Sequence, residues 1–288
     1  MKITLWGTRG TVPTPPLPGS PLSSLGGNTP CVAVDVDGCE PLILDGGTGL
    51  HWLGDALLSG DFARGCGLAH LLLTHTHWDH IQGIPFFPPL IVPGNRFTFY
   101  GCGSGGRSLA ALLDDQMDTV YCPVPNPFSC AVGAHVEVRE IGKESFQIGP
   151  VQLTARRVNH RPDTACLGYR LQHGNAVMAY LPDVEYLEEK HRHPALGLAR
   201  DADLLIHDAH FTSAEYAHRR GQGHCSDGDA ADLARDAGAR HLLLFHHHPD
   251  RKDASGYATA RTVGNPIVEA ACEGARYVIA DDGARRIS

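Results

Sequence analysis

The chain has 288 residues, is 42% hydrophobic and carries a formal net charge of −8 at pH 7. This length and composition fit one large domain built of two halves, about 1–150 and 151–288, and exclude a disordered or fibrous protein. The acidic balance argues against a large nucleic-acid partner, because binding a phosphate backbone calls for a basic surface. The argument does not exclude a small anionic substrate, since bound cations would supply positive charge at the site.

Targeting and disulfide signals are absent from the sequence. No apolar run reaches the length of a membrane-spanning helix, and the N-terminus opens directly on a strand pattern rather than on a signal peptide. We therefore expect a cytoplasmic protein with no membrane partner. The nine cysteines are scattered and include no C-x-x-C pair, which disfavours both a disulfide framework and a structural zinc knuckle.

The first part of the chain is predicted to form strands joined by Pro/Gly-rich connections, over residues 3–7, 31–36 and 41–45. The connection over 11–30 contains six prolines and is expected to lie over the surface near the functional site. A helix is predicted over 50–58, where the apolar residues recur with helical periodicity.

A histidine-rich loop follows the next predicted strand, over 69–73. Its sequence is Thr74-His75-Thr76-His77-Trp78-Asp79-His80. His75 and His77 are two residues apart, so an extended segment points both the same way, and Asp79 and His80 follow where the chain must turn. One loop could thus offer ligands to two adjacent cations, and imidazole with carboxylate suits zinc, manganese or iron. The alternative is chance clustering, because the chain has 18 histidines.

The middle of the chain contains several prolines. A helix start is predicted over 81–87, broken by Pro85 and the prolines that follow it. A strand over 97–101 and a helix over 108–117 come next. Residues 121–128 read as a loop, which either forms a wall of the pocket or is a plain surface loop.

The second half again alternates strands with helices. A helix capped by Ser226 is predicted to run through Ala237 and to end before Gly238. A last helix is predicted from Asn265-Pro266 to Gly274. Strands are predicted over 151–158, 168–171, 176–180, 204–208, 241–245 and 277–280.

Polar residues follow several of these apolar strands. His75, Asp183, Asp208 and His246 each stand at or just after the carboxyl end of one. Strand ends that converge on one edge of a sheet form the usual ligand-binding rim. An isolated His or Asp at a strand end is commonly a turn former, but repetition at several strands favours a binding site.

The segment from His75 to His80 resembles the HxHxDH signature of the metallo-β-lactamase-fold hydrolases. The segments 6–10 and 26–31, and the order of motifs in the second half, resemble the phosphodiesterase-like branch, which includes tRNA 3′-end endonucleases and small-phosphodiesterase relatives. The resemblance covers nearly the whole chain. It implies an α/β fold, an αββα sandwich of two mixed β-sheets flanked by helices, and homodimers are common in this branch.

The resemblance also implies two divalent metal ions, zinc first, with manganese or iron as alternatives. His75, His77 and His160 would hold the first ion, Asp79, His80 and His246 would hold the second, and Asp183 would bridge them. A water between the ions would become the hydroxide nucleophile. Asp45 either caps a turn or braces a metal-bound imidazole, and the family places an Asp there.

A proton donor is implied by the segments 207–212 and 223–226. In the family an acidic residue in the first segment pairs with a His in the second, which here gives Asp208 and His224. An imidazole titrates near neutrality and could protonate a departing alkoxide. The alternative is that His224 only stabilises the turn before the helix capped by Ser226.

These inferences predict a metal-dependent phosphodiesterase acting on a small or cyclic phosphodiester, such as a cyclic nucleotide or a phosphoribosyl cyclic phosphate. No long Gly/Pro-rich arm of the kind used to grip tRNA is visible, and no large nucleic acid is expected as a partner. One alternative is hydrolysis of a carbon ester, thioester or lactone at the same centre. The other is a catalytically silent binding or accessory module on this fold.

Overall fold

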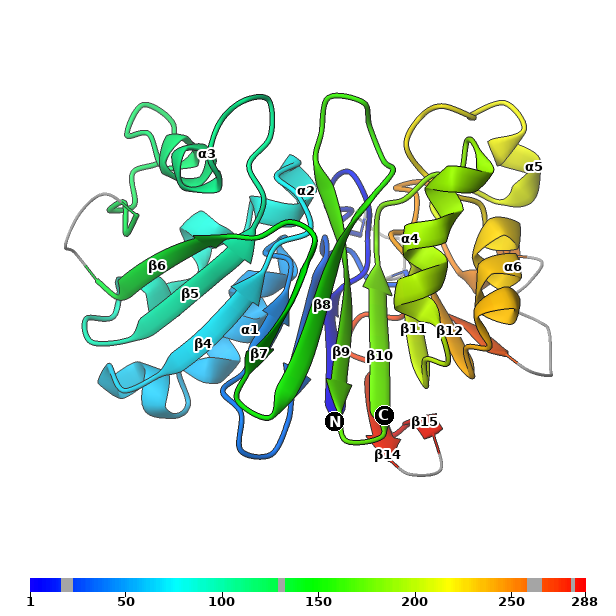
Figure 1. Cartoon of the computed structure of the whole chain (residues 1–288). Coiled ribbons are helices and arrows are strands. Elements are labelled where there is room, and N and C mark those ends of the chain that lie inside the picture. The colour runs from blue at the N-terminus through cyan, green and yellow to red at the C-terminus, as the bar shows by residue number, and fades with distance from the viewer. Residues whose placement is uncertain (17–22, 129–132, 258–265, 281–282) are drawn as a thin grey trace.

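The computed structural model describes residues 1–16, 23–128, 133–257, 266–280 and 283–288. Two mixed β-sheets pack face to face, and helices cover their outer faces (Figure 1). The αββα sandwich expected from the sequence is therefore confirmed. Among the described residues, no helix combines the length and the apolar character needed to span a membrane.

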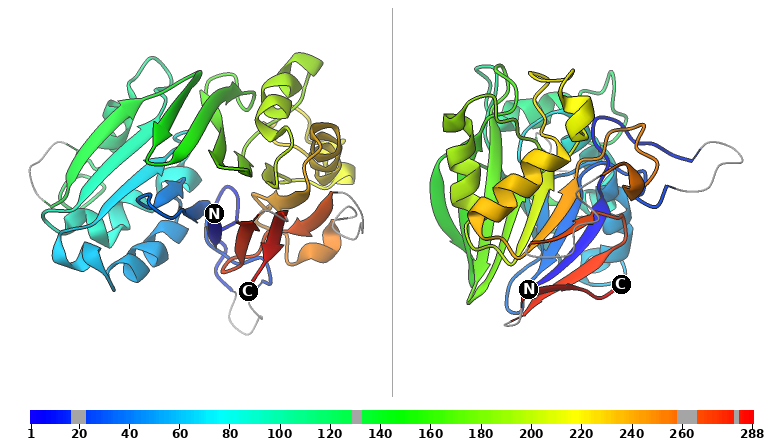
Figure 2. Two further views of the ribbon diagram at one scale, coloured as in Figure 1. Left: turned by 60° about the horizontal axis from the view of Figure 1, so that its bottom comes forward. Right: turned by 90° about the vertical axis from the view of Figure 1, so that its right-hand side faces the viewer.

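The first sheet has the strand order β15-β14-β1-β2-β3-β4-β5-β6. The strands from β3 to β6 run parallel, and the other pairs are antiparallel. Because β14 pairs with β1, the two ends of the chain lie close together (Figure 2). The members are β1 (Lys2–Gly7), β2 (Cys31–Asp35), β3 (Leu42–Leu44), β4 (Leu68–Leu72), β5 (Arg96–Gly101), β6 (His135–Glu140), β14 (Arg276–Ala280) and β15 (Gly283–Arg286).

The second sheet has the order β13-β12-β11-β10-β9-β8-β7. Its strands from β10 to β13 are parallel, so their carboxyl ends meet at one edge, while β7 to β10 are antiparallel. The members are β7 (Glu144–Ile148), β8 (Val151–Val158), β9 (Cys166–His173), β10 (Ala176–Leu181), β11 (Leu204–Asp208), β12 (His241–Phe245) and β13 (Ile267–Ala270).

The helices cover the outer face of each sheet and leave the carboxyl ends of the strands free for loops. Helices α1 (Gly49–Leu57) and α3 (Leu109–Gln116) pack on the first sheet, and α4 (Glu189–Ala199) and α6 (Asp227–Ala237) pack on the second (Figure 1). Shorter elements are α2 (Trp78–Ile81), α5 (Ser213–Tyr216) and the 3-10 turns η1 (Asp61–Arg64), η2 (Ile84–Phe86), η3 (Pro88–Ile91) and η4 (Ala254–Gly256).

The burial pattern of the strands follows from this layering. Every residue of β11 and of β12 is buried, because the other sheet covers one face of these parallel strands and helices cover the other. In β8 the burial alternates instead, with Leu153 and Ala155 packed between the sheets. Burial of this continuous apolar layer is the main favourable term in folding.

Helix α6 begins and ends where the sequence predicts. The Ser226 hydroxyl accepts a hydrogen bond from the Asp229 backbone N–H, and the Asp229 carboxylate accepts one from the Ser226 N–H, which forms a capping box. Gly238 ends the helix with a φ of 69°, a left-handed conformation that glycine adopts without steric cost. The cap matters for the site because it fixes the segment just after His224.

Two predictions about local structure are wrong. Residues 266–274 contain β13 instead of a helix, because Val268 and Ala270 alternate with more exposed neighbours and the strand pairs with β12; Asn265 lies outside the described residues. The helix expected from residue 81 begins earlier, at Trp78, and ends at Ile81 before Gly83. The sequence reading also missed α4, α5, β6, β7 and β15.

Candidate metal centre

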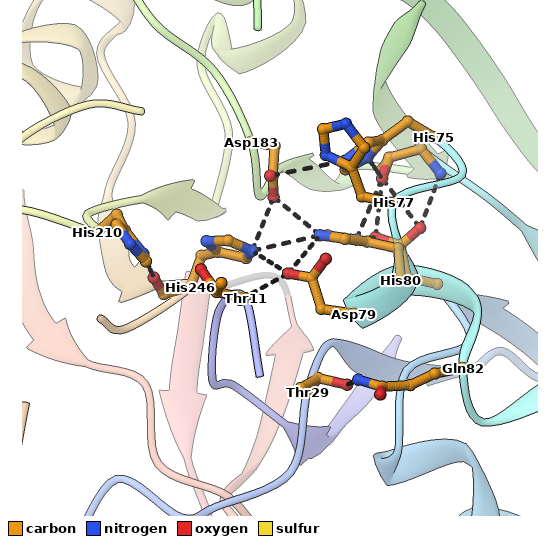
Figure 3. A network of polar contacts seen from close by, with 12 residues as sticks. Thr11, Thr29, His75, His77, Asp79, His80, Gln82, Asp183, His210 and His246 are labelled. Atoms are coloured by element: carbon orange, nitrogen blue, oxygen red, sulfur yellow. Dashed lines mark hydrogen bonds and ion pairs between the residues drawn. The ribbon is translucent and has the colours of Figure 1, made fainter. Parts of the chain in front are cut away.

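Seven of the residues that the sequence singled out meet at the edge where the carboxyl ends of the parallel strands lie. All of them except His160 are labelled in Figure 3. The loop after β4 and the short helix α2 supply His75, His77, Asp79 and His80 from one sheet. The segments after β8, β10 and β12 supply His160, Asp183 and His246 from the other. The site therefore lies between the two sheets and needs both.

One set of donor atoms comprises those of His75, His77, His160 and Asp183, which all lie within 4.8 Å of one another. His160 Nε2 is 3.2 Å from His77 Nδ1. Asp183 Oδ2 is 3.7 Å from His75 Nε2 and 3.6 Å from His160 Nε2. Three imidazoles and a carboxylate at this spacing are a donor set that divalent transition metals accept.

A second set comprises Asp79, His80 and His246, also within 4.8 Å of one another. His246 Nε2 lies 3.0 Å from Asp79 Oδ2. Asp183 turns its other oxygen, Oδ1, to this set, at 3.1 Å from His80 Nε2 and 3.2 Å from His246 Nε2. Asp183 thus faces both sets at once, as a bridging carboxylate must.

The imidazoles are oriented by contacts of the ring nitrogen that faces away from these sets. Such contacts fix the ring and the tautomer of a metal-binding histidine. Four of the five imidazoles have such a contact, and only His246 Nδ1 has no hydrogen-bond partner. The four contacts join His75 Nδ1 to Thr74 Oγ1 at 3.1 Å, His77 Nε2 to Thr164 Oγ1 at 3.1 Å, His80 Nδ1 to Asp45 Oδ2 at 2.9 Å and His160 Nδ1 to the Gly223 carbonyl at 2.6 Å.

The electrostatics keep His75, His160 and Asp183 in the charge states that metal binding requires. His80 differs, because the carboxylates of Asp183, Asp45 and Asp79 outweigh burial and raise its pKa well above the ordinary value, so a metal ion bound there must displace a proton. Burial lowers the pKa of His75 well below its ordinary value and that of His160 to about 4, so both stay neutral at pH 7. Burial alone would raise the pKa of Asp183, but His246 and His80 outweigh it and hold the pKa well below its ordinary value. Asp183 therefore remains ionised.

The residues fit two divalent cations on this evidence. His75 Nε2 and Asp183 Oδ1 are buried side-chain atoms without a hydrogen-bond partner, and both point into the cluster. Leaving such atoms unsatisfied is costly, so they call for a ligand. The donor chemistry, imidazole and carboxylate without thiolate, agrees with the metals named from the sequence.

Backbone strain is concentrated around the same centre. Among the described residues, four that are not glycine have positive φ, and three of them, Thr11, Asp45 and His246, adjoin the cluster. The Thr11 N–H donates to Asp79 Oδ2 at 2.7 Å, so the start of the connection over 11–30 lies at the site as expected; residues 17–22 lie outside the described part. Such conformations cost energy and persist where the surroundings enforce them.

A cavity of about 560 Å³ opens over the cluster. None of its described lining residues comes from 121–128, so that loop does not form its wall. The lining residues are Thr11, Thr76, His77, Trp78, Asp79, His160, Arg161, Asp183, Gln222, His224 and His246.

His224 and Asp208, the pair predicted from the sequence, are in contact beside the cluster. His224 Nδ1 lies 2.8 Å from Asp208 Oδ2, and Asp208 also accepts hydrogen bonds from the backbone N–H groups of Val184 and His210. Burial opposes the charged imidazole, yet the Asp208 carboxylate raises the pKa of His224 to about 9. This pKa favours the protonated ring at pH 7, and His224 lines the cavity.

His210 was missed by the sequence reading. Its Nδ1–H donates to the His246 carbonyl at 2.8 Å, and its ring stacks on that of His224 with a centroid distance of 4.4 Å. A ligand atom of His210 lies within 4.8 Å of those of His224 and His246. The signal available was its position two residues beyond Asp208, at the end of the same strand.

The Asp45 carboxylate makes four contacts, and one of them orients His80. Besides His80 Nδ1, its carboxylate accepts hydrogen bonds from the Thr74 backbone N–H at 2.7 Å, the Thr74 hydroxyl at 3.0 Å and the Tyr180 hydroxyl at 3.0 Å. Of the two alternatives for Asp45, this geometry favours the brace of an imidazole.

Replacing Asp45 with asparagine is expected to weaken metal affinity about 10- to 100-fold, because the carboxylate that orients His80 is lost. Asparagine tolerates the positive φ of 59° at this position, so the backbone should be preserved. Competition with a chromophoric chelator measures the affinity. Tyr180→Phe, which removes one donor to the same carboxylate but leaves the contact with His80, serves as the control. Equal affinities in Asp45→Asn and wild type would show that Asp45 only stabilises the turn.

Comparison with known proteins agrees with this geometry. A family model described as the Beta-lactamase superfamily domain matches residues 52–247. The chain belongs to the beta-lactamase superfamily. The membership confirms the predicted hydrolase class and the family resemblance. Ribonuclease Z of Haloferax volcanii is 27% identical over 293 aligned positions, which cover 85% of this chain and 84% of that protein.

Solved structures share the fold at lower identity. The short form of human tRNase Z is 20% identical, with a TM-score of 0.65 over 97% of this superfamily member and 100% of that chain. A diphosphatase from the PhnP family is 19% identical, with a TM-score of 0.66 over 97% and 98% of the two chains.

One prediction from the sequence is overturned here. The acidic net charge led us to expect no large nucleic acid as a partner, yet relatives aligned over 85% of the chain are named ribonucleases. Net charge failed as a criterion because it sums over the whole surface, whereas binding depends on the local field, to which bound cations contribute.

Proposed function

We propose that this superfamily member is a metal-dependent phosphodiester hydrolase with two divalent ions, zinc in the first place, held by the seven residues described above. One observation carries the choice of an alkoxide leaving group. His224, with its pKa raised and its ring paired to Asp208, lines the cavity beside the candidate metal ligands. An alkoxide leaving a phosphodiester needs a proton, and this pair is placed to supply it.

Each part of the site then has a role. The bound cations would supply positive charge to the phosphate and activate the attacking water. Asp183 faces both donor sets and so fixes their spacing. Asp208 accepts the Nδ1–H of His224 and favours the charged ring, in which Nε2 also carries a proton. His224 Nε2 gives that proton to the leaving oxygen.

The two alternatives from the sequence are weaker. A carbon ester or lactone could be attacked at the same centre and would also release an alkoxide, but the names of the relatives, ribonuclease Z and tRNase Z, favour a phosphodiester. A catalytically silent module would not need a buried cluster with unsatisfied donor atoms aimed into it, such as His75 Nε2 and Asp183 Oδ1.

Two substrate classes follow from different observations. The names of the relatives, ribonuclease Z and tRNase Z, support an RNA whose 3′ end is trimmed. The motifs shared with small-phosphodiesterase relatives, together with the fold shared with a PhnP-family diphosphatase, support a small or cyclic phosphodiester. The assay below separates the two.

Protein stripped of metal with a chelator and reloaded with zinc, manganese or iron(II) is expected to hydrolyse bis(p-nitrophenyl) phosphate only when reloaded. A p-nitrophenyl carbon ester shares the leaving group, so it tests the atom attacked. An RNA with a 3′ extension and a cyclic nucleotide are run beside them. Protein that holds two metal ions per chain but cleaves only the carbon ester would refute the proposal, and protein that cleaves nothing would be a silent module.

A further inference from the structure

A buried carboxylate next to the site has no cationic partner. Glu185 has an exposed fraction of 0%, and among the described residues no lysine, arginine or histidine nitrogen lies within 4.0 Å of it. Its three partners are neutral donors: the Tyr216 hydroxyl at 3.0 Å, the Gly221 N–H at 2.6 Å and the Gly223 N–H at 2.7 Å. Burying a carboxylate without a counter-charge is costly, so its role calls for an explanation beyond packing.

Two of the three donors belong to the loop that leads into His224. Gly221 and Gly223 donate their backbone N–H groups to different oxygens of Glu185, so the carboxylate holds both ends of the loop 221–223. His224 follows at once, with Asp208 on its other side. The orientation of His224 therefore depends on a side-chain contact to Asp208 and on a backbone held by Glu185.

The same loop also orients a metal ligand. The Gly223 carbonyl accepts the Nδ1–H of His160 at 2.6 Å. Gly223 has a φ of +92°, and a Cβ there would lie 2.8 Å from His160 Nδ1, so the loop backbone is pressed directly against this imidazole. A shift of the loop must move His160 as well as His224.

Glu185 also contacts Asn159, the residue before His160, through its own backbone. Its N–H donates to the Asn159 carbonyl at 2.8 Å, and its carbonyl accepts a hydrogen bond from Asn159 Nδ2 at 2.8 Å. Glu185 also stands two residues after Asp183. One residue thus ties together the segments that carry Asp183, His160 and His224.

We propose that Glu185 is a positioning residue that couples the metal centre to the proton donor by fixing the loop 221–223. The part of this inference that concerns His160 stands on metal binding alone, and the part that concerns His224 rests on the proposed phosphodiesterase function.

The variant Glu185→Gln tests these two loop contacts with almost no change in side-chain volume. A glutamine amide has one acceptor oxygen and a donor NH₂ group, so one of the two loop N–H groups must face another donor. The loop should loosen at that end. Tyr216→Phe is the matched control, because it removes a donor to the same carboxylate but leaves both loop contacts.

Two readouts report the two ends of the coupling. Chelator competition should show metal affinity lowered about 10-fold in Glu185→Gln, as expected when a contact that orients a ligand is lost. Turnover should fall about 10-fold or more for a dinucleoside monophosphate, whose alkoxide leaving group needs a proton, and much less for bis(p-nitrophenyl) phosphate, whose leaving group does not. Tyr216→Phe should match the wild type in both.

The outcomes separate this inference from the proposed function. The inference would be overturned if Glu185→Gln binds metal as tightly as the wild type and the ratio of its turnover on the two substrates is also unchanged, whether or not both turnovers fall. If the wild type cleaves no phosphodiester, the proposed function fails, and the affinity of Glu185→Gln still decides the part that concerns His160. Thermal unfolding shows whether Glu185→Gln is folded. If it is not, Glu185→Asp, which keeps the charge but has a shorter side chain, is measured in its place with the same two readouts.

Discussion

Asp183→Asn is expected to lose most of the bound metal and to lower kcat/KM for bis(p-nitrophenyl) phosphate by at least about 10³-fold, because a shared ligand of both ions is removed. Asp183 is buried and lies within 4.0 Å of an imidazole nitrogen of each of His75, His80, His160 and His246. The surrounding imidazoles keep the pKa of its carboxyl low, so the ionised form is available throughout the useful pH range. An amide has the same shape but lacks the negative charge.

Metal content per chain, measured by elemental analysis after desalting, is the first readout because it does not depend on the substrate. Asp203→Asn is the matched control, since Asp203 is also buried, directly before β11, and accepts a hydrogen bond from the Val177 N–H at 2.9 Å, at the opposite end of the strands. The control should keep its metal and its activity. Full metal content in Asp183→Asn would remove Asp183 from the ligand set.

His224→Ala is expected to lower turnover of a dinucleoside monophosphate by about 10²- to 10⁴-fold, the usual effect of losing a general acid. The loss on bis(p-nitrophenyl) phosphate should be far smaller, because p-nitrophenolate leaves without a proton. Metal content should stay normal. Asp208→Asn should show the same dependence on the leaving group, because His224 Nδ1 then loses the carboxylate at 2.8 Å that orients it and favours its charged form.

The pH profile gives an independent check on the same variant. His224 acts in its protonated form, so its contribution is present below its pKa and is lost as the pH rises through it. Asp208, with Asp183 and Asp79, raises this pKa to about 9 against the effect of burial. Bound cations would offset the last two carboxylates, so the alkaline limb should lie at or below pH 9. Equal losses on both substrates, or an unchanged alkaline limb in His224→Ala, would refute the role of proton donor.

The cluster itself was readable from the sequence because its main signal is local. Four candidate ligands stand within six residues, from His75 to His80, and an extended chain followed by a turn dictates where such side chains point. The strand-end positions of Asp183, Asp208 and His246 were equally visible, since short buried strands are marked by unbroken apolar runs. The αββα arrangement came from the family resemblance, because spacing does not specify which strands pair.

Tertiary structure decided what depends on contacts between distant segments. The alternation of Val268 and Ala270 became a strand because β12 offers a free edge there, whatever the preceding Asn-Pro pair suggests. Three contacts join residues from separate loops: the pairing of Asp208 with His224, the hydrogen bonds of Glu185 to the loop 221–223, and the stacking of His210 on His224. Sequence determines local direction and burial, but these contacts exist only once the two sheets pack and bring their strand ends to one edge.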